Sequence, residues 1–222
     1  MTANGPAPAR KSALFLEVSA VAAEHARVDC LVVPVFSDER PLRDSAGRAD
    51  WRLCGRLSQV LAAGRASGRR GEAVLAASFG GVVAPLVLVL GAGRRSDFAA
   101  DGIQELAREA VRRGAGLRVA AIALALPESS RDVPDLAVRV EQLLLGAVEG
   151  LASRSEERPT DLRLHVLVRS DELPRALELL RTRRPARLHA SVTLRAVEAV
   201  ERRDPRGGRV VTPEPRAADS VK

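Results

Sequence analysis

The hydrophobic pattern of the chain centres on one strand–turn–helix unit. The run VAPLVLVL at 83–90 is continuously apolar, as a strand covered on both faces requires. The turn Gly91-Ala92-Gly93 and a polar loop follow, and then a helix is predicted over 101–113, ending near Gly114. Its inward face repeats every three or four positions: Ile103, Leu106, Ala107, Ala110 and Val111. Such a unit is the basic element of an α/β domain.

Hydrophobic periodicity in the rest of the chain predicts the remaining strands and helices of a complete domain. Further strands are predicted at 14–19, 28–36, 72–79, 117–126, 161–168 and 187–197. Further helices are predicted at 51–63, at 134–152, and from a cap at Ser170 or Asp171 to Leu180. Residues 37–50 are predicted to be a polar loop, and Pro34 to kink or end its strand.

The order ββαββαβαβαβ predicts a mixed sheet sandwiched between helices. Residues 13–200 would form this single domain. The Pro/Ala/Gly-rich stretch 1–12 and the Arg/Pro/Gly-rich stretch 201–222 are expected to be disordered tails.

Composition narrows the range of partners. The 222 residues carry a net charge of +7, and lysine occurs only at Lys11 and Lys222, so the base is nearly all arginine. Arginine suits carboxylate and phosphate recognition, although diffuse arginine richness also follows from GC-rich coding. With one tryptophan, four phenylalanines and no tyrosine, a base-stacking platform for single-stranded nucleic acid is disfavoured.

Residues able to carry catalysis do not cluster in the sequence. Cys30 and Cys54 suit neither a disulfide framework nor a zinc site, and Cys30 is expected to be a core residue. The three histidines lack metal-ligand spacing, and no nucleophile elbow or acid–base carboxylate pair is present. We therefore expect no metal and no cofactor. No signal peptide or transmembrane stretch is found, which predicts a cytoplasmic protein without membrane contact.

One candidate ligand site stands out. Gly91, Gly93, Arg94 and Arg95 could cradle a phosphate with backbone N–H groups and guanidinium forks. The spacing matches neither a dinucleotide fingerprint nor a P-loop, and the alternative is a tight strand exit that only glycine permits. Arginine pairs could also form a basic patch, or simply be separate solvated side chains: 69/70, 94/95, 112/113, 183/184 and 202/203.

Four stretches carry a family resemblance. They are DCLVVPVF (29–36), GRLSQVLAAGRASGRRGEAVLAA (55–77), LVLVLGAGRRSDFAADGIQELAREAVRR (86–113) and VEQLLLGAVEG (140–150). In this order and spacing they resemble the N-terminal domain of the M17 family, the cytosolic leucyl aminopeptidases. The resemblance spans about residues 13–180 and implies a macro-domain-like fold.

The resemblance also bears on activity. In the family this domain precedes a catalytic domain that holds two metal ions, an Asn-Thr-Asp-Ala-Glu-Gly-Arg segment and a metal-binding lysine, and neither element occurs in this sequence. No catalytic or metal residue is carried over, so no peptidase activity is expected. Macro domains bind ADP-ribose through an asparagine-rich turn, whereas the corresponding turn here is Pro34-Val35-Phe36-Ser37.

Three functional hypotheses follow. The first is a non-catalytic M17 N-terminal-like domain that acts in protein interaction, assembly or regulation, with a protein partner or by self-association. The second is a macro-like module that binds a nucleotide or ADP-ribose-type phosphate ligand at Gly91–Arg95. The third is a basic DNA-binding accessory protein, whose affinity would fall steeply with salt.

Overall fold

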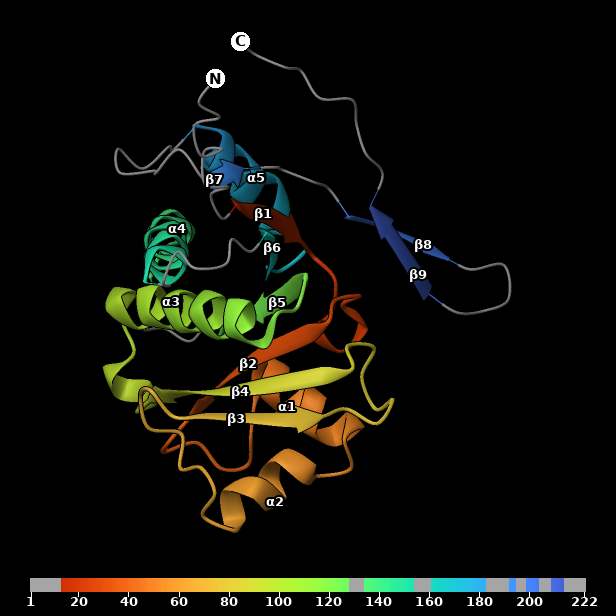
Figure 1. Ribbon diagram of the computed structural model, residues 1–222, viewed down its shortest axis with the longest axis vertical. Helices are drawn as coiled ribbons and strands as arrows, with labels where there is room; N and C mark the ends of the chain where they lie inside the picture. Colours follow the sequence, from red (N-terminus) through yellow and green to blue (C-terminus); the bar gives the residue numbers. More distant parts are fainter. Residues whose placement is uncertain are drawn as a thin grey trace, which may run out of the picture.

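The computed structural model describes residues 13–127, 134–153, 161–182, 192–194, 199–203 and 209–213. One seven-stranded sheet organises the chain, in the order β3-β4-β2-β5-β6-β1-β7 (Figure 1). Its strands are β1 (Ala13–Ser19), β2 (Cys30–Phe36), β3 (Ala73–Ala77), β4 (Leu86–Gly93), β5 (Ala121–Ala125), β6 (Asp161–Leu167) and β7 (Val192–Leu194). The edge strand β3 is antiparallel to β4, and every other pairing is parallel. The carboxyl ends of the parallel strands therefore meet at one edge of the sheet.

Helices cover both faces of the sheet. They are η1 (Ala23–His25), α1 (Asp44–Arg52), α2 (Arg56–Ala62), η2 (Arg95–Asp97), α3 (Ala100–Leu117), α4 (Leu136–Ala152) and α5 (Leu173–Thr182). Side chains alternate along β2: Cys30 and Val32 join the core beneath α3, α4 and α5, whereas Leu31 and Val33 join the core beneath η1, α1 and α2. The predicted mixed sheet between helices is confirmed. No described helix has the length and apolarity needed to cross a membrane.

The helix pair α3–α4 packs at very short range because α4 presents glycine to α3. A Cβ on Gly146 would lie 2.0 Å from the carbonyl oxygen of Gln104. One turn later, a Cβ on Gly150 would lie 2.4 Å from the carbonyl oxygen of Arg108. The small residues let the two backbones approach closely, and this contact closes the core over β5 and β6.

The helix predicted over 51–63 is two helices in the structure, and the first begins inside the predicted polar loop 37–50. The break lies at Cys54 (φ 54°) and Gly55 (φ 77°), both in the left-handed region. The carboxylate of Asp50 explains the restart of the helix, since it accepts hydrogen bonds from the N–H groups of Leu57 (2.8 Å) and Ser58 (3.0 Å).

Other boundaries also differ from the pattern, and the predicted turn Gly91-Ala92-Gly93 belongs to strand β4, which runs from Leu86 to Gly93. Helix α3 runs past Gly114 to Leu117, because Gly114 faces the core, where a Cβ would lie 2.9 Å from Ile122. The chain then turns at Arg118 (φ 57°), so β5 starts only at Ala121. Strand β2 continues through Pro34, and the irregularity falls between Val35 and Phe36.

The C-terminal part contains strands where a disordered tail was expected. Strands β8 (Ala199–Arg203) and β9 (Arg209–Pro213) pair antiparallel as a separate two-stranded sheet. Valines and threonine in these segments favour extended backbone, which the arginine, proline and glycine content of the stretch obscured. Of the predicted strand 187–197, the structure describes 192–194. Residues 1–12 and the rest of 201–222 lie outside the described residues.

Candidate functional site

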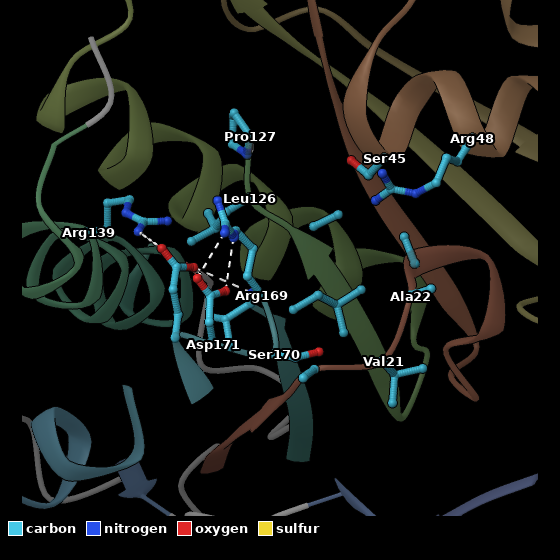
Figure 2. Close-up of a pocket in the computed structure, with 16 residues that line it drawn as sticks. Val21, Ala22, Ser45, Arg48, Leu126, Pro127, Arg139, Arg169, Ser170 and Asp171 are labelled. Carbon is cyan, nitrogen blue, oxygen red and sulfur yellow. Dashed lines mark hydrogen bonds and ion pairs between the residues drawn. The ribbon is translucent and has the colours of Figure 1, made fainter. Parts of the chain in front are cut away.

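A cavity of about 400 Å³ lies at the edge where parallel strands β1, β5 and β6 end. Its walls come from the segments that follow these strands, together with the start of α1 and of α4 (Figure 2). Crevices beyond the carboxyl ends of strands are where ligands bind in open α/β sheets. The volume lies within the roughly 300–1,000 Å³ that small-molecule sites occupy.

Three arginines from separate elements line this cavity. Figure 2 shows Arg139 and Arg169 on one side and Arg48 on the other. Arg139 is 7% exposed and forms an ion pair with Glu172. Arg169 donates from Nη2 to Asp171 Oδ2 at 2.8 Å, and Arg48 Nε lies 3.5 Å from a Glu24 carboxylate oxygen. Basic side chains thus lie on both sides of the cavity, each contacts a carboxylate, and two of these carboxylates, Asp171 and Glu172, also line the cavity.

Among the described residues, two buried polar atoms of the cavity lining have no hydrogen-bond partner. They are the hydroxyl oxygen of Ser45, a residue 2% exposed, and Nε of Arg139. Leaving a buried donor unpaired costs roughly 1–3 kcal/mol, and buried polar groups in folded proteins are nearly always satisfied. Both atoms are closed off from solvent, so a ligand in the cavity could reach them only after these side chains move.

The apolar part of the lining separates the two polar sides. Leu126 and Pro127 follow β5, and Val21 and Ala22 follow β1. An apolar surface between sparse, fixed polar groups is typical of small-molecule sites.

The predicted cradle Gly91–Arg95 lies at the end of β4, and its backbone donors are used within the fold. Gly91 N–H donates to the carbonyl of Glu72 (2.8 Å), and Gly93 N–H donates to the carbonyl of Gly68 (2.9 Å). A Cβ on Gly91 would lie 1.9 Å from Arg69 O. The close packing against Arg69 therefore explains why glycine occupies position 91.

The two arginines of the predicted cradle contact carboxylates of their own chain. Arg95 Nη1 lies 3.1 Å from Asp44 Oδ2 and 3.6 Å from Glu39 Oε1, and the guanidinium stacks 4.6 Å from the centre of the Phe36 ring. Arg94 Nε lies 3.8 Å from Asp38 Oδ2, with its side chain two-thirds exposed. A phosphate would have to compete with these carboxylates, so this ligand site stays a prediction.

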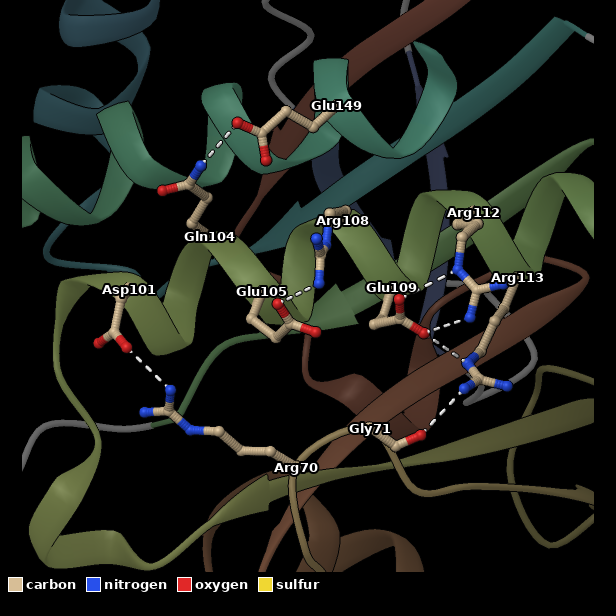
Figure 3. A network of polar contacts seen from close by, with 10 residues as sticks. All are labelled: Arg70, Gly71, Asp101, Gln104, Glu105, Arg108, Glu109, Arg112, Arg113 and Glu149. Atoms are coloured by element: carbon tan, nitrogen blue, oxygen red, sulfur yellow. Dashed lines mark hydrogen bonds and ion pairs between the residues drawn. The ribbon is translucent and has the colours of Figure 1, made fainter. Parts of the chain in front are cut away.

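The arginine pairs in the described part of the chain also find internal partners. Arg70 donates to Asp101 (2.8 Å), and Arg112 and Arg113 both bind Glu109 (Figure 3). Arg113 also donates to the carbonyl of Gly71 (3.0 Å). The contacts of Arg70 with Asp101 and of Arg113 with Gly71 fasten the 65–72 segment to α3, whereas the contacts with Glu109 lie within the helix. The side chains of 183/184 and 202/203 lie outside the described residues.

The remaining chemistry-bearing residues do not gather into a second site. Among the residues that the structure describes, no three of His, Cys, Asp and Glu lie close enough to hold a metal. Cys30 is a core residue, as predicted, and burial raises the pKa of its thiol to about 11. Cys54 is exposed, and His189 lies outside the described residues.

Sequence reasoning missed the residues of the cavity, which are Ser45, Arg48, Arg139 and Arg169. For Arg139 a signal existed: it lies on the inward face of its predicted helix, between Leu136 and Leu143. A charged residue on an apolar face needs a partner or a role. For Ser45 no signal existed, since its position was expected to be loop.

The chain is similar to known proteins of one family. Residues 32–156 match the model of the cytosol aminopeptidase family, N-terminal domain. The probable cytosol aminopeptidase of Methylobacillus flagellatus is 31% identical over 157 residues, which cover 67% of this chain and 32% of that protein. The chain thus spans about a third of the length of this relative.

Two solved structures show the same fold. A tomato leucine aminopeptidase mutant superposes with a TM-score of 0.57 at 18% identity, covering 78% of this chain and 36% of that one. The Oceanobacillus iheyensis macrodomain, in a structure with ADP, superposes with a TM-score of 0.56 at 10% identity, covering 72% and 87%. The expected macro-domain-like fold is confirmed.

Proposed function

The chain belongs to the cytosol aminopeptidase N-terminal-domain family, and we propose that this domain is a non-catalytic module that binds a small phosphate-bearing ligand in the cavity at the ends of β1, β5 and β6. One observation carries the proposal: Ser45 Oγ and Arg139 Nε are buried in the cavity lining without a partner. The names of its relatives support a cytoplasmic location for this module.

Phosphate fits the donors because its oxygens accept from several directions at once. On binding, the side chains of Arg139 and Ser45 would turn their unpaired Nε–H and hydroxyl groups toward such oxygens, while Arg48 adds positive charge. Leu126 and Pro127 offer an apolar surface to the uncharged part of the ligand. The Oceanobacillus iheyensis macrodomain with ADP makes a nucleotide the first ligand class to test.

The proposal assigns no peptide hydrolysis to this domain. The matched family model is that of the N-terminal domain, and the curated relative extends well beyond the matched region. Incubation with leucyl-para-nitroanilide and manganese or zinc should give no turnover. Metal-dependent turnover that survives repurification would contradict the non-catalytic assignment.

Calorimetric titration with ADP, ADP-ribose and inorganic phosphate tests the ligand, with adenosine as the uncharged comparison. We expect the phosphate compounds to bind and adenosine not to bind. Ser45→Ala should weaken binding about tenfold, the worth of one charge-assisted hydrogen bond. Arg139→Met should abolish binding, and its melting temperature shows whether loss of the Glu172 pair has unfolded the domain.

The double variant Arg94→Ala with Arg95→Ala is the matched control, because it tests the Gly91–Arg95 turn. Under the proposal it binds like the wild type. If it alone loses the ligand while Ser45→Ala is unaffected, the turn is the site and the cavity is not. If none of the phosphate compounds binds, the proposed function is wrong.

Protein interaction, the first hypothesis from the sequence, is a second candidate. The observation that favours it is the exposure of two of the five aromatic residues: Trp51 is 77% and Phe79 is 78% exposed. Apolar surface of this kind is typical of interaction sites. Its test is sedimentation velocity together with the binding experiment that follows.

A further inference from the structure

One edge of the main sheet has no neighbour in the described part of the chain. Strand β3 is the outermost strand and pairs only with β4. Its sequence AVLAA contains neither a charged residue nor a proline. Edge strands of folded proteins normally carry such features to prevent further pairing. At its centre, Leu75 is 44% exposed.

The hydrogen-bond register identifies the groups that face outward. Gly91 N–H donates to Glu72 O (2.8 Å), and Ser78 N–H donates to Pro85 O (2.9 Å), so positions 72 and 78 point their backbone groups toward β4. In an antiparallel ladder the inward and outward positions alternate, and 74 and 76 therefore also point inward. The outward N–H and C=O groups are those of Ala73, Leu75 and Ala77.

An aromatic and basic surface continues from the carboxyl end of β3. Phe79 follows two residues after the strand, and the Arg56 guanidinium stacks 4.5 Å from the centre of its ring. A Cβ on Gly81 would lie 2.7 Å from Arg52 O, so this loop rests on the end of α1. The Arg52 guanidinium in turn lies 5.6 Å from the ring centre of Trp51.

Arginines thus lie beyond both ends of the open edge. Arg69 and Arg70 precede β3, where Arg70 pairs with Asp101 and the Glu72 carboxylate is held by backbone N–H groups. Arg52 and Arg56 lie at the Phe79 end. A second copy paired antiparallel about Leu75 would bring the exposed Arg69 of each copy toward the Arg56 end of the other. Like charges would then face each other across the interface, which disfavours self-pairing.

We propose that the open edge of β3 binds an extended segment of another protein, whose apolar strand is flanked by aspartate or glutamate. Ala73, Leu75 and Ala77 would supply the main-chain hydrogen bonds of the added strand. Leu75 and Phe79 would contact its apolar side chains, and the arginines would contact its acidic flanks. This deepens the protein-interaction candidate and is independent of a ligand in the cavity.

The probe is a fluorescein-labelled peptide with an alternating valine–threonine core between two glutamates at each end. The comparison peptide has lysines in place of the glutamates. Fluorescence anisotropy should show binding of the glutamate peptide only, and rising salt should weaken it. Trp51, the one tryptophan of the chain, supplies a second readout through its emission.

Leu75→Pro is the decisive variant, because proline removes an outward N–H and leaves the hydrogen bonds to β4 in place. This variant should weaken peptide binding at least tenfold, because one main-chain hydrogen bond is lost and the proline ring obstructs the added strand. Its melting temperature shows whether the domain is folded, and Leu75→Glu, which keeps the backbone donor but places a negative charge at the edge, should also weaken binding. Arg52→Glu with Arg56→Glu should abolish it, whereas Arg175→Glu on the exposed face of α5 should not change it.

Three results would overturn the proposal: no binding of the glutamate peptide, equal binding of the lysine peptide, or full binding by folded Leu75→Pro. A dimer in sedimentation velocity that Leu75→Pro dissociates would identify a second copy as the occupant instead. Ser45→Ala should bind the peptide normally, so failure here and failure of the ligand proposal are separate results.

Discussion

Nδ1 of His165 lies 3.3 Å from Oε2 of Glu17, where the two residues are direct neighbours on parallel strands β6 and β1. Burial lowers the pKa of His165; Glu17 opposes this shift and Arg163 adds to it. The neutral imidazole is therefore favoured in the folded protein.

This pair predicts a pH dependence of stability. Because the folded pKa lies below the unfolded value of 6.5, the folded state binds fewer protons between the two values. Stability is complete above pH 6.5 and falls as pH decreases toward the folded pKa, by at most about 1.4 kcal/mol per pH unit. Urea unfolding at pH 7.5, 6.5 and 5.5 should show this loss. His165→Gln should flatten the dependence of stability on pH, and Glu17→Gln should steepen it. Equal slopes in all three proteins would contradict the role given to His165.

Glu72 holds the turn that precedes β3. Its carboxylate accepts from the N–H groups of Ser67 (2.7 Å), Gly68 (2.9 Å) and Arg69 (3.2 Å), and these hydrogen bonds, the one from Ser67 above all, lower the pKa of Glu72. Glu72→Ala should cost about 1–2 kcal/mol at pH 7 by urea unfolding.

The contribution of Glu72 has a defined acid limit. A depressed folded pKa gives stability that is present above the unfolded value of 4.5 and is lost as pH falls through the folded pKa. The difference between wild type and Glu72→Ala should therefore shrink below pH 4.5. Glu178→Ala, at an exposed position of α5, is the control and should change stability by less than about 0.5 kcal/mol. A constant difference down to pH 3 would refute the charge-based account.

The close approach of α3 and α4 can be tested by comparing a glycine at the contact with a glycine that faces open space. Gly146→Ala would place a methyl 2.0 Å from Gln104 O and should destabilise the domain by about 1–3 kcal/mol. Gly116→Ala, in the last turn of α3 with nothing within 4 Å, should stabilise it by about 0.5–1 kcal/mol. Thermal unfolding measures both. The two variants must change the stability in opposite directions. If Gly146→Ala left the stability unchanged, the two helices could move apart without cost.

Gly91 tests the tight strand exit. Alanine at this position would meet Arg69 O at 1.9 Å, so Gly91→Ala should cost about 1–3 kcal/mol through displacement of the 65–72 segment. Gly80→Ala, with open space but φ 80°, isolates backbone strain and should cost about 1–2 kcal/mol. Proteolysis near Arg69 should increase in Gly91→Ala and not in Gly80→Ala; the same pattern in both would argue against a local clash.

The sequence was least informative where individual side-chain contacts decide the local structure. The break at Cys54 depends on Asp50 capping α2, and the extension of α3 past Gly114 depends on Ile122 filling the space beside that glycine. Both partners lie within eight residues in the sequence, but hydrophobic periodicity does not show that their side chains make these contacts. The candidate site shifted because the tertiary structure decides which donors are used. The N–H groups of Gly91 and Gly93 donate to carbonyls of the segment before β3, while Ser45 and Arg139 come to line one cavity only after folding.

The sequence by itself determined the α/β class, the strands and helices of the core, and the family, because burial imposes periods of two and 3.6 residues that side-chain hydrophobicity records directly. Only the tertiary structure decided which polar groups remain unpaired and which strand lies at the edge. Both depend on contacts between residues far apart in the chain, such as Arg139 with Glu172 and β3 with β4, and hydrophobic periodicity carries no information about such pairings.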